Sequence, residues 1–231
     1  MSDCAVIELA AYCGFDFVRI DLEHSLVDNF ALANLIRTAS LLELPVQVRI
    51  AYLGEVTRIL DCGVNGIVVP DVTDSDTAKQ AVELCKFAPL GKRGMYPVGR
   101  GLRFGLDDFG AYYEKANKQT DLIVQIEDKT AIDNIDEILS VDGVDMVASG
   151  KADLSQSLGV PAQCSHKRVL EAEDYIIKKA LAYKKKPVIM ASTRQRVDQL
   201  AEMGVENIII GPDTSLLCQS FKDILNSFKT S

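Results

Sequence analysis

Short apolar runs rich in Val and Ile alternate with helical patterns along almost the whole chain. Between most of these runs, apolar residues recur at three- and four-residue spacing, which is typical of amphipathic helices. Strands that alternate with helices pair in parallel through right-handed crossovers. The expected strands are 15–21, 45–50, 66–70, 121–126, 144–149, 187–190 and 206–211. The alternation predicts an α/β fold, a TIM-type (β/α)8 barrel.

The number of strands falls one short of a closed barrel. Seven runs qualify, whereas a TIM-type barrel has eight strands. Residues 3–13 already form a helical pattern, so the usual strand before the first helix is missing from this chain. The segment 94–98 (GMYPV) is a candidate extra strand, although Pro97 cannot donate a ladder hydrogen bond. Since single-domain barrels of roughly 200 to 250 residues are common, we expect one barrel domain over residues 1–231.

Helix start and stop signals support this division of the chain. Short polar side chains precede several helical patterns, where they can accept hydrogen bonds from the first free N–H groups, and glycines follow several helix ends. The expected caps are Asp28 or Asn29, Asp74 and Thr193, and the glycines are Gly63, Gly143 and Gly204.

Composition argues against nucleic-acid and membrane partners. The net charge is −8 with a pI near 4.9, and no clustered basic footprint is present to replace DNA or RNA counterions. No apolar stretch approaches the roughly 18 residues that span a bilayer, and the N-terminus lacks a signal-like pattern. Six scattered cysteines without C-x-x-C spacing suit reduced, buried thiols. We therefore expect a cytoplasmic protein.

The connection between residues 88 and 120 is long for a compact domain. It contains five glycines and the basic residues Lys92, Arg93, Arg100 and Arg103, but no P-loop motif. We expect it either to cap a site and help hold an anionic substrate or to form an oligomer contact.

Charged residues follow several of the predicted strands. The carboxyl ends of parallel strands meet on one face, so groups from distant stretches would share a single site. These groups are Asp21, Glu23 and His24, then Arg49, Glu127 and, beyond Gly150, Asp153. Their convergence indicates an enzyme.

Glu127 and Asp153 would lie at the mouths of neighbouring strands. Two carboxylates there suit a hard divalent cation, with water and substrate oxygens completing the coordination. No Cys or further His lies near them in sequence, which argues against zinc. The backbone N–H groups of 150–153 would face a substrate carboxylate, as in a chelated 2-oxo acid. The alternative is that each carboxylate only caps the helix that follows it.

His24 and Arg49 are the candidates for proton transfer and charge stabilisation. A carboxylate beside an imidazole raises its basicity, as a general base near neutral pH requires; a purely structural histidine is the alternative. Arg49 interrupts an apolar strand and would stabilise an enolate oxygen, or form an ion pair with Asp21, Glu23 or Asp61. The other histidine, His166, is expected in a loop.

Seven stretches of the sequence resemble one known superfamily, in the same order. They are GFDFVRIDLEH, the Arg in PVQVRI, LDCGVNGIVVPDV, APLGKRG, LIVQIE, VDGVDMVASGKADLS and IIIGPDTSLL. The chain resembles the metal-dependent 2-oxo acid aldolases of the HpcH/HpaI aldolase and citrate lyase superfamily. The resemblance implies a TIM-type barrel, a homo-oligomer with helix exchange between subunits (a hexamer is one option), and a divalent metal, Mg²⁺, Mn²⁺ or Co²⁺.

The resemblance also implies roles for individual residues. Glu127 and Asp153 match the metal ligands, and Arg49 matches the arginine on the pyruvate oxygens. His24 with Asp21 matches the acid–base dyad, while Glu23 matches a carboxylate that acts through metal-bound water. The residues expected beside the substrate are Gln125, Gly150, Lys151 and Ala152; Lys151 stands where many members have Pro.

The activity implied is reversible retro-aldol cleavage of a 4-hydroxy-2-oxo acid to pyruvate, or a related 2-oxo acid, plus an aldehyde. Three alternatives stay open: oxaloacetate decarboxylation, a citrate-forming or citryl-cleaving reaction through the same metal enolate, and a non-catalytic barrel subunit.

Overall fold

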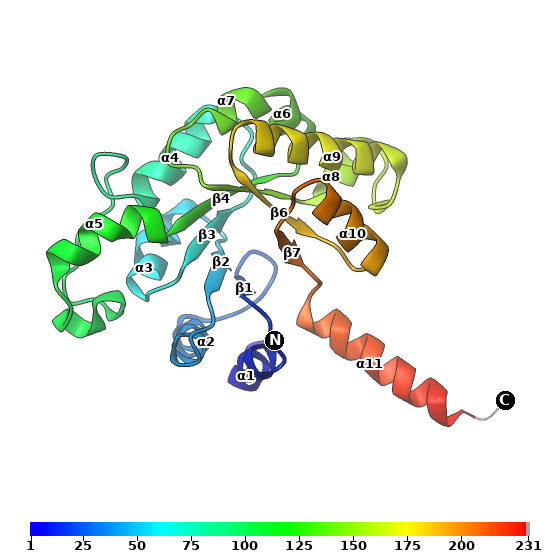
Figure 1. The fold of residues 1–231 in the computed structure, drawn as a ribbon, viewed down its shortest axis with the longest axis horizontal. Helices are drawn as coiled ribbons and strands as arrows, with labels where there is room; N and C mark the ends of the chain where they lie inside the picture. The colour runs from blue at the N-terminus through cyan, green and yellow to red at the C-terminus, as the bar shows by residue number, and fades with distance from the viewer. Residues whose placement is uncertain (230–231) are drawn as a thin grey trace.

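A curled parallel sheet forms the centre of the computed structural model, which describes residues 1–229 (Figure 1). All neighbouring strands pair in parallel and follow one another in chain order. The strands are β1 (Val18–Asp21), β2 (Val46–Arg49), β3 (Gly66–Val69), β4 (Asp121–Ile126), β5 (Met146–Ser149), β6 (Lys186–Met190) and β7 (Asn207–Ile209). The predicted seven strands and the barrel-type α/β fold without its first strand are confirmed.

The helices, apart from the last one, cover the outside of the curled sheet (Figure 1). They are α1 (Cys4–Tyr12), α2 (Asn29–Leu41), α3 (Val56–Asp61), α4 (Ser75–Cys85), α5 (Phe109–Gln119), α6 (Lys129–Asp133), α7 (Ile135–Leu139), α8 (Lys151–Ser157), α9 (Lys167–Ala182), α10 (Arg194–Glu202) and α11 (Asp213–Phe228), with short 3₁₀ segments η1 (Leu53–Glu55) and η2 (Arg100–Gly105). The helices α6 and α7 follow each other directly and are separated only by Asn134.

The predicted caps lie where the sequence placed them. Each capping side chain, at Asp28, Asp74 and Thr193, accepts a hydrogen bond from a backbone N–H in the first turn of its helix. The glycines that follow α3, α7 and α10 all have left-handed backbone, with φ between 86° and 96°.

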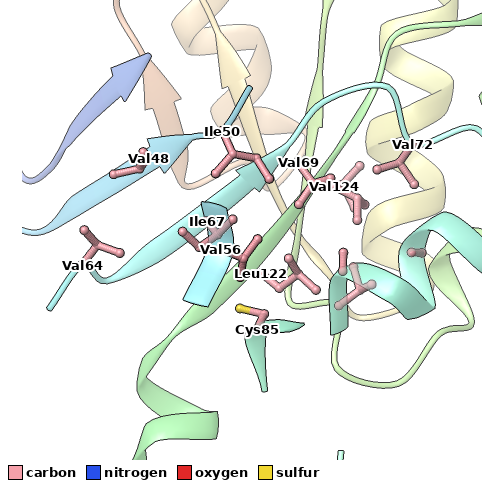
Figure 2. Packing of buried hydrophobic residues seen from close by; sticks show 14 of the residues in the cluster. Val48, Ile50, Val56, Val64, Ile67, Val69, Val72, Cys85, Leu122 and Val124 are labelled. Atoms are coloured by element: carbon pink, nitrogen blue, oxygen red, sulfur yellow. The ribbon is translucent and has the colours of Figure 1, made fainter. Parts of the chain in front are cut away.

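The core lies on both sides of the sheet because alternate residues of each strand face opposite sides, and a further cluster of buried residues packs between β6, α9 and α10. The larger part lies between the sheet and the outer helices, and Figure 2 shows Ile67, Val69, Leu122 and Val124 packed there. The smaller part fills the barrel interior with the alternate residues Val68, Ile123, Met146, Ala148 and Val188. At the amino end of the sheet the inward-facing polar residues Arg19 and Gln47 are hydrogen-bonded to each other, whereas the inward-facing polar groups at the carboxyl ends include charged residues from several strands.

The segment 94–98 is not a strand, so that candidate was wrong. Pro97 has no N–H to give to a ladder, and the surrounding residues form turns instead. Among the described strands, β1 and β7 pair on one side only, and the sheet stays open between them (Figure 1).

The basic loop between α4 and α5 packs at the amino end of the sheet. Arg93 forms an ion pair with Asp61 at 3.0 Å, and Arg100 donates to the carbonyl oxygen of Cys62 at 3.1 Å. Both partners lie at the end of α3, just before β3 begins. Within its own chain the loop therefore does not cap the carboxyl ends of the strands, and the expected oligomer contact is the alternative that remains.

The last helix, α11, extends away from the barrel (Figure 1, red). None of its described side chains is buried. Its large apolar side chains are exposed, namely Leu216, Leu217, Phe221, Ile224, Leu225 and Phe228. Across residues 1–229, no helix combines the length and the apolar character needed to cross a membrane.

Candidate active site

An arginine held by two carboxylates lies at the ends of β1 and β2. Asp21 and Arg49 are paired in the sheet register, and Arg49 is paired with Val68, so these side chains face the barrel interior. Arg49 donates from Nε and Nη2 to the two carboxylate oxygens of Asp21, at 2.9 and 2.6 Å. Its Nη1 lies 3.0 Å from Glu23 Oε2. This bidentate grip fixes the plane of the guanidinium.

These ion pairs shift the acidities of their members in different directions. Burial acts to raise the pKa of Asp21, but the hydrogen bonds and charge of Arg49 outweigh it and hold this pKa below its usual range. For Glu23, burial dominates and raises the pKa despite the attraction of Arg49 and His24. Glu23 therefore has a greater affinity for protons than an ordinary glutamate, while Asp21 stays ionised.

His24 lies beside Glu23 rather than Asp21. The imidazole Nε2 is 3.6 Å from Glu23 Oε2, and the side chain is 62% exposed. Asp21 Oδ1 instead accepts the backbone N–H groups of Glu23 and His24, at 3.0 and 3.4 Å. The turn after β1 thus brings all three predicted residues together, with the imidazole on the Glu23 side.

Gln125 and Glu127 face the same interior side as Arg49. Gln125 pairs in register with Ala148 of the inner core, and Glu127 and Gly150 each follow two residues later on the same side. Glu127 Oε2 accepts a hydrogen bond from Gln125 Nε2. A Cβ atom at Gly150 would lie 2.1 Å from Glu127 Oε2, so only glycine leaves room for this carboxylate.

Glu127 does not cap the helix that follows. Asp128 performs that role for α6 through a hydrogen bond from the N–H of Thr130. Glu127 is only 3% exposed, and its Oε1 accepts the backbone N–H of Asp71 at 2.8 Å. Burial raises the pKa of Glu127, and the negative charges of Asp71 and Glu23 add to this rise.

Asp153 lies in the first turn of α8, whose N-cap is Gly150. Asp153 and Ala152 are both exposed at this turn. The Lys151 ammonium donates to the carbonyl oxygen of Met190 at 3.1 Å and lies 3.5 Å from Glu173 Oε1. The Lys151 ammonium is therefore already paired, and the backbone N–H is the group of Lys151 that we expect to contact a ligand.

The carboxylate oxygens at this end of the barrel are the type of ligand that a hard divalent cation prefers. Glu23 Oε2 is buried and, among the described residues, accepts no hydrogen bond; its contact with Arg49 is an ion pair alone. Within residues 1–229 no group of three or more His, Cys, Asp or Glu is arranged to hold a metal. Two carboxylates with water and substrate oxygens would suit Mg²⁺, which commonly uses one or two protein carboxylates.

The profile of the HpcH/HpaI aldolase/citrate lyase family matches residues 1–220. The chain belongs to this family.

Individual relatives agree with this assignment. The chain is 35% identical over 218 residues to a hydroxypyruvate/pyruvate aldolase of Sagittula stellata, covering 92% of this chain and 84% of the relative. It is 32% identical over 236 residues to a 2-keto-3-deoxy-L-rhamnonate aldolase of Escherichia coli, covering 96% and 84%. The crystal structure of the citrate synthase SbnG superposes with a TM-score of 0.90 at 31% identity, covering 98% and 89%. The predicted family and enzyme class, a carbon–carbon lyase, are confirmed.

Two features of this family member's site were not predicted from sequence. Asp71 follows β3 and is thus also a charged residue at a strand end, so the rule that selected the other residues would have found it in VVPDV. The second is Glu173, which is fully buried and binds Ser149, Lys151 and Arg196. Its position inside a regular amphipathic helix gave no signal of this role.

Proposed function

We propose that the protein catalyses reversible retro-aldol cleavage of a 4-hydroxy-2-oxo acid to pyruvate, or a related 2-oxo acid, plus an aldehyde. The observation that carries this proposal is the buried Glu127 carboxylate beside the Arg49–Glu23 pair at the carboxyl ends of the strands. The names of the two aldolase relatives support the substrate class.

Glu127 and Asp153 would hold a divalent cation, Mg²⁺, Mn²⁺ or Co²⁺. When bound, such a cation supplies Lewis-acid polarisation of the substrate keto group. Arg49 is oriented by Asp21 so that Nη1, on the side of Glu23, can donate to the oxygen that becomes negative as the enolate forms. Gln125 and the backbone of Gly150, Lys151 and Ala152 would hold the acid end of the substrate.

Proton transfer falls to the pair of Glu23 and His24. The raised pKa of Glu23 and its contact with the His24 imidazole suit a carboxylate that shares a proton with a neighbour. We assign to His24 the role of moving the proton between substrate and solvent, because its side chain reaches both Glu23 and water. Asp21 keeps Arg49 in place and stays ionised.

Schiff-base chemistry is not part of this proposal. Lys151, the lysine nearest Gly150, directs its ammonium to Met190 and Glu173. Borohydride treatment with pyruvate should therefore leave no covalent adduct on Lys151. A trapped adduct that retains pyruvate carbon would contradict the proposed mechanism.

The test follows pyruvate methyl protons by NMR in deuterium oxide, with Mg²⁺ or Mn²⁺ present. The wild-type protein should exchange these protons above the rate of the buffer, and a chelator should abolish the exchange. His24→Ala should slow it by about 10²-fold or more, a typical contribution of a general base. His166→Ala is the matched control, because the His166 side chain accepts a hydrogen bond from the Arg168 N–H at the start of α9 and has no role in the proposed reaction. Exchange that survives complete metal removal would refute the proposal.

A second candidate function is condensation of an acyl group with the same enolate. The similarity to the citrate synthase SbnG at a TM-score of 0.90 favours it. Incubation with oxaloacetate separates the reactions: carbon dioxide release indicates decarboxylation, and consumption only when an acyl donor is added indicates citrate-type condensation. Cleavage of 4-hydroxy-2-oxo acids without either reaction supports the aldolase.

We also propose a homo-oligomer in the reducing cytoplasm, with a hexamer as one arrangement. The exposed apolar side chains of α11 and the six free thiols support these two parts of the proposal. The expectation that these thiols are buried was wrong, since only Cys85 is buried. Analytical ultracentrifugation of wild type and Phe221→Asp tests the assembly. The variant should sediment as a smaller species, and unchanged sedimentation would exclude α11 from the interface.

A further inference from the structure

Asp71 has a backbone conformation that residues other than glycine seldom adopt. Its φ is 53°, in the left-handed region, where the Cβ atom of an L-residue comes too close to the following carbonyl oxygen. Its side chain is exposed and lies at the surface after β3. Burial of the side chain therefore does not account for the strain.

The flanking residues leave the turn little freedom. Val69 and Val72 are buried on either side of it, 2% and 0% exposed, and Figure 2 shows both packed in the outer core. Pro70 lies between Val69 and Asp71 and has a fixed φ of its own. The backbone at Asp71 is thus held by packing on both sides, which is how strained conformations persist.

The strained conformation directs one backbone group at the candidate site. The N–H of Asp71 donates to Glu127 Oε1 at 2.8 Å, while Gln125 donates to the other oxygen. Glu127 is therefore held at both oxygens by β4 and by the turn after β3. If Asp71 relaxed to an ordinary φ while Val69 and Val72 stayed packed, the peptide plane between Pro70 and Asp71 would have to turn, and Oε1 would lose its donor.

We infer that Asp71 is a positioning residue whose left-handed backbone orients the Glu127 carboxylate for cation binding. The inference rests on the proposed metal role of Glu127. Asp and Asn tolerate left-handed backbone better than most residues, which accounts for the residue type at this position. The function lies in the backbone, so the charge of the side chain is dispensable.

The experiment measures Mn²⁺ binding by titration of the free-ion electron paramagnetic resonance signal, without substrate or turnover. Asp71→Val disfavours the left-handed conformation, and Asp71→Gly permits it without any side chain. We expect Asp71→Val to weaken Mn²⁺ binding by about 10- to 100-fold, the usual effect of removing a group that orients a ligand. Asp71→Gly and Asp71→Asn should stay within about threefold of wild type, since both accept this backbone.

A matched control separates positioning from general destabilisation. Glu43 also has a left-handed backbone, with φ 55°, and an exposed side chain, but it lies between α2 and β2. Glu43→Val should lower the melting temperature about as much as Asp71→Val and leave Mn²⁺ binding unchanged. Should Asp71→Val not fold, Asp71→Ala carries the same backbone penalty in a milder form and should still weaken binding measurably.

Each outcome decides between the two proposals. Wild-type affinity in Asp71→Val or Asp71→Ala overturns the inference, as does weak binding in Asp71→Gly. If Glu127→Gln binds Mn²⁺ as tightly as wild type, or wild type binds none, the proposed metal role fails and the inference fails with it. Loss in Glu127→Gln with full affinity in Asp71→Val would leave the proposed function intact and reject only the role of Asp71.

Discussion

Two clusters of charged side chains lie at opposite ends of the sheet, and they differ in how well their polar atoms are satisfied. The amino-end cluster centres on Lys86, which is fully buried and donates to the carbonyl oxygens of Asn117 and Thr120 and to Asp145 Oδ2 at 2.6 Å. All three ammonium protons have acceptors. The mouth cluster of Asp21, Glu23, Arg49 and Glu127 instead leaves Glu23 Oε2 without a hydrogen bond and borders the strained turn at Asp71.

The difference separates a structural charge from a functional one. A fully satisfied buried ion pair holds elements together and requires no further partner. The mouth cluster has one oxygen without a hydrogen-bond donor and two carboxylates of raised pKa, Glu23 and Glu127. A bound ligand can supply the missing partners, which is typical of a functional site. In barrel folds the amino face commonly serves stability and the carboxyl face chemistry, and the two clusters follow that division.

The largest effect is expected at Glu127. Glu127→Gln should lower turnover by at least about 10³-fold, because roughly 4 kcal/mol of transition-state stabilisation is a reasonable share for a metal site. The melting temperature should stay equal or rise, since a buried charge is removed. Kinetics and thermal unfolding of the same preparation measure both. Activity within tenfold of wild type would contradict the functional role of the mouth cluster.

Lys86→Met tests the opposite cluster. Removing the ammonium leaves the Asp145 carboxylate and two carbonyl groups without their partner, so the free energy of unfolding should fall by about 3 to 5 kcal/mol. Denaturant titration measures this, and kcat/KM of the remaining folded protein should change less than twofold. Lys92→Met is the control, because the Lys92–Glu83 pair is exposed and should contribute less than about 1 kcal/mol. A large loss of kcat/KM in Lys86→Met would contradict the purely structural role of the amino-end cluster.

Gly150→Ala tests the close packing at the mouth. The new Cβ would lie 2.1 Å from Glu127 Oε2, so the carboxylate or the turn must move. We expect a stability loss of about 1 to 3 kcal/mol, as for other overpacked sites, and weaker Mn²⁺ binding. Gly94→Ala is the control, since a Cβ there meets no atom within 4 Å. Equal behaviour of the two variants would show that Glu127 can move freely.

Asp21→Asn should have the smallest effect, and this effect should depend on pH. The folded-state pKa of Asp21 is lowered, so its contribution to stability is present above the unfolded carboxyl pKa of about 3.9 and is lost as pH falls through the folded value. The stability difference from wild type should therefore be at most about 1 kcal/mol near pH 6, given solvent screening, and should shrink toward pH 3. A difference that grows on acidification would contradict the depressed pKa.

The sequence predicted the barrel well because its strands are buried on both faces. A continuous apolar run such as Ile67, Val68 and Val69 is typical of a parallel strand that is covered on both sides. The caps were predicted for a similarly local reason, since Asp74 bonds to a residue three positions away. The segment 94–98 and the position of the basic loop were not predicted correctly. The packing of this loop against the end of α3 depends on contacts between distant stretches of the chain.

The sequence predicted which residues make up the candidate site, but it did not predict which of them bind one another. Convergence of strand ends placed Asp21, Arg49 and Glu127 near one another, as topology requires. It could not tell whether His24 turns toward Asp21 or Glu23, because that depends on the course of a short turn. Nor could it show the strain at Asp71, since a φ value depends on packing at Val69 and Val72.

The projecting helix α11 has a consequence for how the enzyme behaves at low concentration. Its 16 residues extend about 24 Å at 1.5 Å per residue, with apolar side chains along its length. In the proposed assembly these side chains are covered by another chain, so part of the folding free energy depends on how many chains are present. Specific activity should then decline on dilution and recover on reconcentration.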